Sequence, residues 1–246
     1  MKDMQSVRVH GFDAVRGIAV ISMVAFHLCY DLATFTNVSL PWFSGVLEII
    51  WRNSISWTFL FIAGCMSCYS RSNIKRSFKL LTLAATIFVL TSIVAVDTPI
   101  NFGIIFCLGA SSLVVGTLQQ YKIKISGVKV SALLILMFLA LLHLNDGYLE
   151  LMGISYKLPY ALYSTPYFSW LGLPGPGFTS GDYYPVLPYT LMFLAGWSFC
   201  SSWKEAGISD QFVNVSCKPL EFIGKHALLV YILHQPLLLG LLQVIS

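Results

Sequence analysis

The sequence predicts an all-α, polytopic integral membrane protein with about seven transmembrane helices, and three observations lead to this fold class. Of the 246 residues, 57% are apolar and only 11% are charged, whereas about 25% are charged in a typical soluble domain. The mean hydropathy is +0.75. Long apolar runs take up most of the chain, so residues 1–246 are interpreted as one transmembrane domain.

The apolar runs define the predicted helices. A bilayer core about 30 Å thick needs about 20 mostly apolar residues in each helix. Seven stretches meet this condition, approximately 14–35, 46–69, 78–96, 101–120, 128–145, 184–203 and 222–244. The first is too long for a signal peptide and lacks a convincing cleavage site of small residues, so it is expected to remain as a span.

The distribution of basic residues predicts the orientation. Thirteen of the fifteen lysine and arginine residues fall on one side of the predicted spans, and only Arg52 and Lys157 fall on the other. Cytoplasmic loops carry the excess of basic residues. The N-terminus is therefore predicted to be cytoplasmic and the C-terminus to lie outside.

The connection 146–183 is predicted to lie outside and is rich in Tyr, Trp, Pro and Gly. Because aromatic residues favour the membrane interface, we expect a short interfacial helix near Tyr160–Trp170, followed by a Gly/Pro turn that covers the outer face. The alternative is a packing loop that does not touch substrate.

Ionisable side chains inside membrane spans are costly, so they are candidate functional residues. Arg16 and His27 are about three turns apart on one face of the first span. Asp31 follows His27 by four residues, where a carboxylate can meet the imidazole and raise its basicity. The alternative is a His–Asp pair that only satisfies two buried polar groups.

Three other segments place polar groups at the outer half of the predicted bundle. Arg52 lies at a depth close to Asp31 and either pairs with it or extends to the interface. His234 interrupts the last span beside Tyr231 and Gln235, and Asp182 stands just before the sixth span. We take this convergence as the predicted site.

Four basic residues are expected at the cytoplasmic side, namely Arg16, Arg71, Lys75 and Arg76. They suit anionic lipid headgroups or a polyanionic ligand such as coenzyme A. The net charge of +4 is too small to indicate nucleic acid. The CxxC of Cys65 and Cys68 lies inside an apolar run without a second ligand pair, so no metal site is predicted.

At these residues the sequence resembles bacterial membrane proteins that share the catalytic domain of heparan-α-glucosaminide N-acetyltransferase. The opening FDAVRGIAVISMVAFHLCYDL carries the pattern of an Arg with a His eleven residues later. Further agreement comes from FLFIAGCMSCYSRS, NFGIIFCLG, DYYPVLPYTLMFLAGW and LEFIGKHALLVYILHQP. One departure is Phe106, which stands where the family commonly has His.

The resemblance implies transfer of an acyl group from cytosolic acyl-CoA to a hydroxyl or amine on the outer side. It implies that His27 is the general base or a transient acyl carrier, that Arg16 contacts the donor, and that His234 and Asp182 support the reaction. It also implies the bacterial inner (cytoplasmic) membrane as the location.

The sequence thus predicts an acyltransferase that uses acetyl-CoA or another acyl-CoA, without a metal, and acts on an envelope sugar or glycolipid. Membrane lipids and a small-molecule or glycan acceptor are its expected partners, and a homo-oligomer is compatible with the sequence. The alternatives are a transporter of small solutes or protons that uses Asp31, His27 and His234 as a relay, and a non-catalytic membrane binding partner.

Overall fold

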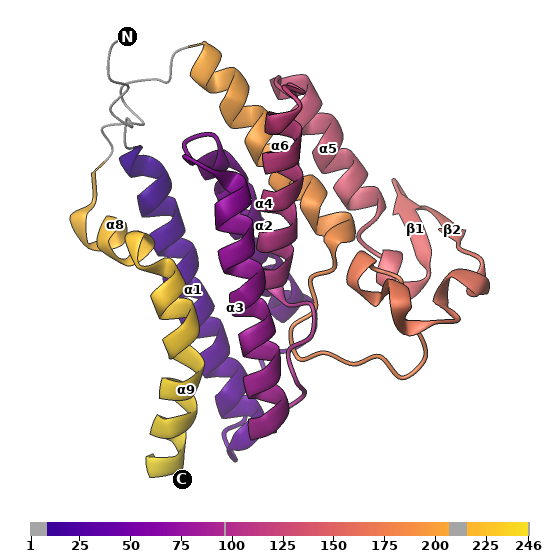
Figure 1. Cartoon of the computed structure of the whole chain (residues 1–246). Coiled ribbons are helices and arrows are strands. Elements are labelled where there is room, and N and C mark those ends of the chain that lie inside the picture. The colour runs from indigo at the N-terminus through magenta and orange to yellow at the C-terminus, as the bar shows by residue number, and fades with distance from the viewer. Residues whose placement is uncertain (1–8, 96, 207–215, 246) are drawn as a thin grey trace. The chain divides into compact units, whose positions relative to one another are not determined.

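The computed structural model describes residues 9–95, 97–206 and 216–245, most of which are helical (Figure 1). The chain packs into two compact units. Residues 9–62 and 216–245 belong to the first unit, and Ala63–Ala206 form the second.

Several helices have the length and composition of membrane spans. Within the described residues these are α1 (His10–Phe35), α2 (Val46–Ser67), α3 (Asn73–Val94) and the segment Val128–Asp146. A fifth exists if α8 (Lys218–Lys225) and α9 (Ala227–Ile245) form one broken span. The chain therefore has the helices of an integral membrane protein.

Each predicted stretch overlaps a helix within the described residues, including α4 (Ile104–Gln120) and α6 (Val186–Glu205). However, α4 is a shorter apolar helix of 17 residues. The number of seven crossings and the orientation of the two ends therefore stay predictions. Within the predicted span 222–244, the helix is interrupted at His226, where α8 and α9 meet at an angle of 79°.

In the first unit, α8 packs directly on the backbone of α1. A Cβ atom on Gly17 would overlap the carbonyl oxygen of Leu220, and a Cβ on Gly224 would overlap that of Asp13. Glycine at both positions is therefore what allows this close approach. The buried Glu221 carboxylate adds a hydrogen bond from Nδ1 of His10 in α1, over 2.6 Å.

The beginning of α2 is joined to α1 by a hydrogen bond between aromatic and hydroxyl side chains. Trp51 donates from Nε1 to Ser22 Oγ over 2.8 Å. The Trp51 ring also packs edge-on against Phe26 of α1, with 5.4 Å between ring centroids.

The second unit contains the end of α2 with α3, α4, α5 (Val128–Ala140) and α6. Side-chain hydroxyls join its helices, since Ser111 and Thr190 lie 2.8 Å apart across α4 and α6. Ser131 of α5 donates to the Ala195 carbonyl of α6 over 2.9 Å. The thiol of Cys65 likewise points to the Gly196 carbonyl, at 3.2 Å.

The connection 146–183 contains an antiparallel hairpin that the sequence analysis did not predict, so the fold is mainly helical rather than all-α. Strand β1 (Tyr148–Leu151) pairs with β2 (Ile154–Lys157). The two turn residues, Met152 and Gly153, have φ values of 51° and 81°, as a type I′ hairpin turn requires. Asn or Asp usually precedes the glycine of such a turn. Met152 stands there instead, so the sequence did not indicate a hairpin.

The predicted interfacial helix near Tyr160–Trp170 consists of two short 3₁₀ helices, η2 (Tyr160–Tyr163) and η3 (Pro166–Leu171). Pro166 begins the second one, because proline suits the first turn of a helix. Another 3₁₀ turn, η1 (Leu144–Asp146), follows α5, and Tyr163 donates its hydroxyl to the Leu144 carbonyl over 2.5 Å. Burial, together with the Asp146 carboxylate, raises the pKa of Tyr163, which keeps the phenol a donor.

The glycine contacts between α1 and α8 generate a stability prediction. Gly17→Ala and Gly224→Ala are each expected to destabilise the protein by about 1–3 kcal/mol, because a methyl group forces two backbones apart. Gly240→Ala is the matched control on α9, since nothing lies within 4 Å of its added Cβ.

Thermal unfolding of the purified variants in detergent measures the effect. The control is expected to unfold at or above the wild-type temperature, because alanine favours helix over glycine. Equal midpoints for all three variants would contradict the close contact.

Candidate functional site

The first unit brings together two histidines on different helices. His27 of α1 and His234 of α9 lie with their ring centroids 4.8 Å apart. The ring of His27 is half-buried, whereas only 8% of His234 is exposed. Both residues were predicted site residues, and the packing of α9 along α1 makes them neighbours.

The hydrogen bonding of His234 assigns its tautomer. Its Nδ1 lies 2.6 Å from the backbone oxygen of Tyr231. A carbonyl oxygen only accepts, so Nδ1 carries the proton and Nε2 of the neutral ring carries the lone pair. Within the part of the chain that the structure describes, the buried Nε2 has no hydrogen-bond partner.

Asp31 is fully buried one turn after His27 and is bound by α9. The side-chain nitrogen of Gln235 lies 2.9 Å and 3.1 Å from the two carboxylate oxygens. The spacing of four residues predicted a contact between Asp31 and His27, and Gln235 had no predicted role. The signal was its position beside His234, but the pairing of residues 204 positions apart is set by the tertiary structure.

Gln235 also leaves a polar atom for the site. Its nitrogen donates to Asp31, so its Oε1 remains as an acceptor, and this atom is buried and without a partner among the described residues. Two adjacent residues of α9 thus each present an acceptor that needs a donor. A buried polar group without a partner carries a penalty of about 1–3 kcal/mol, which makes this arrangement a candidate binding site.

Arg52 is paired with Glu48 of its own helix rather than with Asp31. The two charged groups lie 3.7 Å apart, and 52% of the Arg52 side chain is exposed. Exposed pairs of this spacing contribute only about 0.3–0.5 kcal/mol. A catalytic role for Arg52 stays a prediction.

Arg16 holds α1 and α8 together. Its Nε donates to the Gly224 carbonyl and its Nη2 to Asp13, both over 2.5 Å. Gly224 lies in the last turn of α8, where carbonyls lack partners within the helix. The structure therefore gives Arg16 a structural role, and its predicted contact with an acyl donor stays untested.

The other predicted donor-binding residues lie at the beginning of α3 in the second unit. Arg71 and Lys75 are exposed and Arg76 is half-buried. Cations at a helix N-terminus are disfavoured by the helix dipole, so helix stability does not explain them. Both alternatives, lipid headgroups and a polyanionic ligand, remain open for this basic cluster.

Asp182, the remaining predicted site residue, caps α4 within the second unit. Its Oδ2 accepts a hydrogen bond from the backbone nitrogen of Ile104 over 3.0 Å. The residue that precedes α4, Gly103, has no side chain to do this. On the first turn of the same helix, Phe106 packs on Phe102, with 5.0 Å between centroids.

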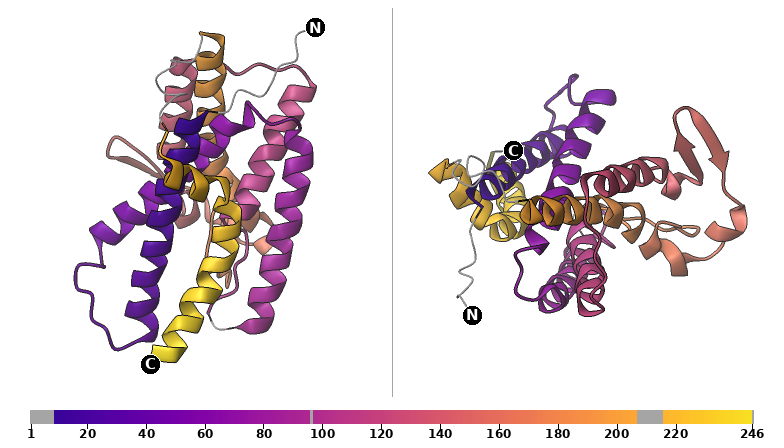
Figure 2. Two further views of the ribbon diagram at one scale, coloured as in Figure 1. Left: turned by 90° about the vertical axis from the view of Figure 1, so that its left-hand side faces the viewer. Right: turned by 90° about the horizontal axis from the view of Figure 1, so that it is seen from above.

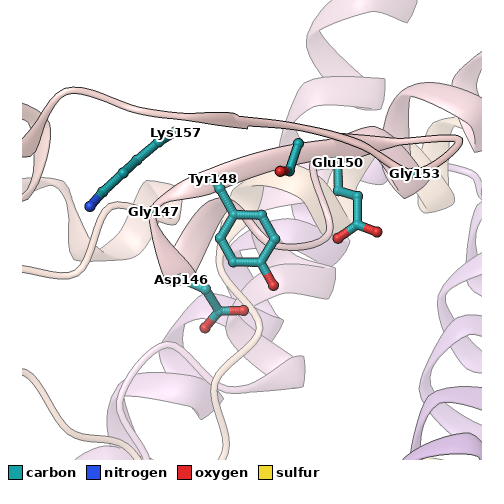
Figure 3. A pocket seen from close by; sticks show the side chains of 7 residues that line it. Asp146, Gly147, Tyr148, Glu150, Gly153 and Lys157 are labelled. Atoms are coloured by element: carbon teal, nitrogen blue, oxygen red, sulfur yellow. The ribbon is translucent and has the colours of Figure 1, made fainter.

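A separate hollow of about 410 Å³ lies on the hairpin (Figure 3). It is lined by polar and charged side chains between residues 146 and 157, and none of the predicted site residues belongs to it. Across the described ranges, no group of three or more His, Cys, Asp or Glu residues is placed to hold a metal ion.

The hydrogen bond by which Asp182 caps α4 generates a prediction that tests its structural role. Asp182→Ala is expected to lose about 1 kcal/mol of stability, because the Ile104 N–H loses its acceptor. Asp182→Asn keeps an acceptor oxygen and is expected to retain wild-type stability. Thermal unfolding of both variants in detergent tests this, and an alanine variant as stable as the asparagine variant would exclude the capping role.

Comparison with known proteins adds one finding. The family model described as "Heparan-alpha-glucosaminide N-acetyltransferase, catalytic" matches residues 8–236, a range that includes His27, His234 and Gln235. No curated protein and no solved structure matches the chain.

Proposed function

The chain belongs to the heparan-alpha-glucosaminide N-acetyltransferase catalytic family, and from this premise we propose that it transfers an acyl group, chiefly acetyl, from cytosolic acyl-CoA to an extracytoplasmic acceptor. Family membership supports acetyltransfer within a membrane in general. The proposal adds the donor, the acceptor class and the residues that act.

The observation that carries the proposal is the pair of unpartnered acceptors on α9. His234 Nε2 and Gln235 Oε1 both need hydrogen-bond donors. A hydroxyl or amine supplies such donors, whereas the carbonyl of a thioester only accepts. The α1–α9 site therefore suits the nucleophile of an acceptor, such as the amine or hydroxyl of a sugar or glycolipid.

In the proposed reaction, His27 is the general base. Its ring takes a proton from the acceptor hydroxyl or amine as that atom attacks the thioester carbonyl carbon. The new C–O or C–N bond forms, the C–S bond breaks, and the coenzyme A thiolate leaves and takes up a proton. An alternative in which His27 briefly carries the acyl group uses the same imidazole.

Neighbouring side chains would keep the site ordered in this scheme. The Tyr231 carbonyl holds His234 in the tautomer that accepts at Nε2. The Asp31–Gln235 hydrogen bonds join α1, one turn after His27, to α9, at the residue that follows His234. A fixed geometry of this kind lowers the entropy lost on reaching the transition state.

The proposed orientation places the large, charged donor at the cytoplasmic side and lets only the acyl group cross. The positive-inside distribution supports a cytoplasmic N-terminus. The exposed basic residues Arg71 and Lys75 suit the phosphates of coenzyme A. A bacterial cytoplasmic membrane is the proposed location.

The test uses purified protein in nanodiscs with acetyl-labelled acetyl-CoA and glucosamine as a probe acceptor. Release of coenzyme A and labelling of glucosamine are followed by chromatography for wild type, His27→Ala and His234→Ala. Loss of a general base is expected to slow the reaction of His27→Ala by about 10²–10⁴-fold.

The matched control is His226→Ala, because His226 is exposed and its ring contacts Phe222 of the same turn, with Nδ1 at 2.8 Å from the carbonyl and the two ring centroids 4.5 Å apart. It is expected to react at the wild-type rate. Transfer that is unchanged in His27→Ala would overturn the mechanism. Solute or proton flux without any transfer would favour the transporter instead.

A further inference from the structure

The hairpin that follows α5 has two chemically different faces. Side chains alternate between the faces of a strand, and the pairs are Tyr148 with Lys157 and Glu150 with Ser155 on one face. Figure 3 shows Tyr148, Glu150 and Lys157 around the polar hollow. The alternate pairs, Leu149 with Tyr156 and Leu151 with Ile154, form what we call the apolar face.

The apolar face is exposed to a degree that is unusual for such residues. The exposed fractions are 45% for Leu151, 77% for Ile154 and 65% for Tyr156, and Met152 at the turn reaches 94%. A hairpin of two strands has no second layer of its own, and it is marginally stable in water without one. Burial of this face would contribute about 25 cal/mol for each Å² removed from water.

The hairpin is attached to the end of a membrane span. Strand β1 begins two residues after the candidate span Val128–Asp146. The backbone nitrogen of Tyr148 donates to the His143 carbonyl over 3.3 Å, and Leu158 donates to the Gly147 carbonyl over 2.8 Å. These bonds hold the base of the hairpin against the end of this candidate span.

The direction of the hairpin agrees with this position. Figures 1 and 2 show it projecting sideways from the C-terminal end of α5, away from α3 and α4 of the same unit. A segment that extends sideways from the end of a membrane span can reach the lipid around that span. On α5 itself, Leu136 (52%) and Met137 (45%) are exposed apolar residues of the same candidate span.

We propose that the hairpin rests on the bilayer, with its apolar face against lipid and its polar face toward water. The hairpin is joined directly to a candidate membrane span that has exposed apolar residues of its own, and lipid is therefore the occupant that this attachment supports. The next segment is of the same character, since Tyr160 is 77% exposed and Tyr167 79%. Aromatic side chains of this kind favour the interface between headgroups and acyl chains.

The experiment places the fluorophore NBD on single cysteines at four consecutive positions. Ile154→Cys and Tyr156→Cys report on the apolar face, and Ser155→Cys and Lys157→Cys are the matched controls on the polar face. Cys29 and Cys217 are replaced by serine, because the other native thiols are buried or lie among helices of the second unit. The protein is placed in phosphatidylcholine nanodiscs, one copy in each, with and without doxyl-labelled lipid.

The emission and quenching of the label are expected to alternate from one position to the next along the strand. Labels at 154 and 156 show blue-shifted emission that doxyl lipid quenches, and labels at 155 and 157 show red-shifted emission that aqueous iodide quenches. Four labels that iodide quenches alike would overturn the proposal. Shielded labels at 154 and 156 that doxyl lipid does not quench would also overturn it, because protein would then cover the face. The outcome is independent of acyl transfer and of His27.

Discussion

The close contact between α1 and α8 is the constraint on which the first unit depends. Glycine at positions 17 and 224 lets the two backbones meet, and Arg16 and Glu221 add polar bonds across the same contact. With α8 held in this way, the break at His226 turns α9 by 79°. That turn allows α9 to run beside α1, so His234 lies against His27.

Some polar groups between α1 and α9 are bound by a neighbouring side chain, and others have no hydrogen-bond partner among the described residues. The bound groups stabilise the packing of the two helices, and those without a partner are candidates for binding a reactant. A buried carboxylate is costly unless it is bound, and Gln235 binds both oxygens of Asp31. The two acceptors that remain, on His234 and Gln235, are satisfied by no described residue. A buried acceptor without a partner is costly, so two of them on adjacent residues favour a site for a hydrogen-bond donor.

In the second unit, the predicted site residue Asp182 has a structural partner instead, since it supplies the missing N-cap of α4. Its polar character beside apolar runs made it a candidate. In the structure the same character satisfies a backbone group, since helix ends in an apolar surrounding have no water to bind. The hairpin, in contrast, leaves its apolar face exposed.

The sequence by itself determined the features that depend on neighbouring residues. Apolar runs of about 20 residues predict helices, and the spacing of His27 and Asp31 places them one turn apart, because a helix has 3.6 residues per turn. The family pattern around Arg16 and His27 is also local. Only the tertiary structure decided that Asp31 binds Gln235, that Asp182 caps α4 and that Arg16 binds α8. These contacts join residues 78 to 208 positions apart. No local periodicity specifies such pairs, since they follow from how the helices pack against one another.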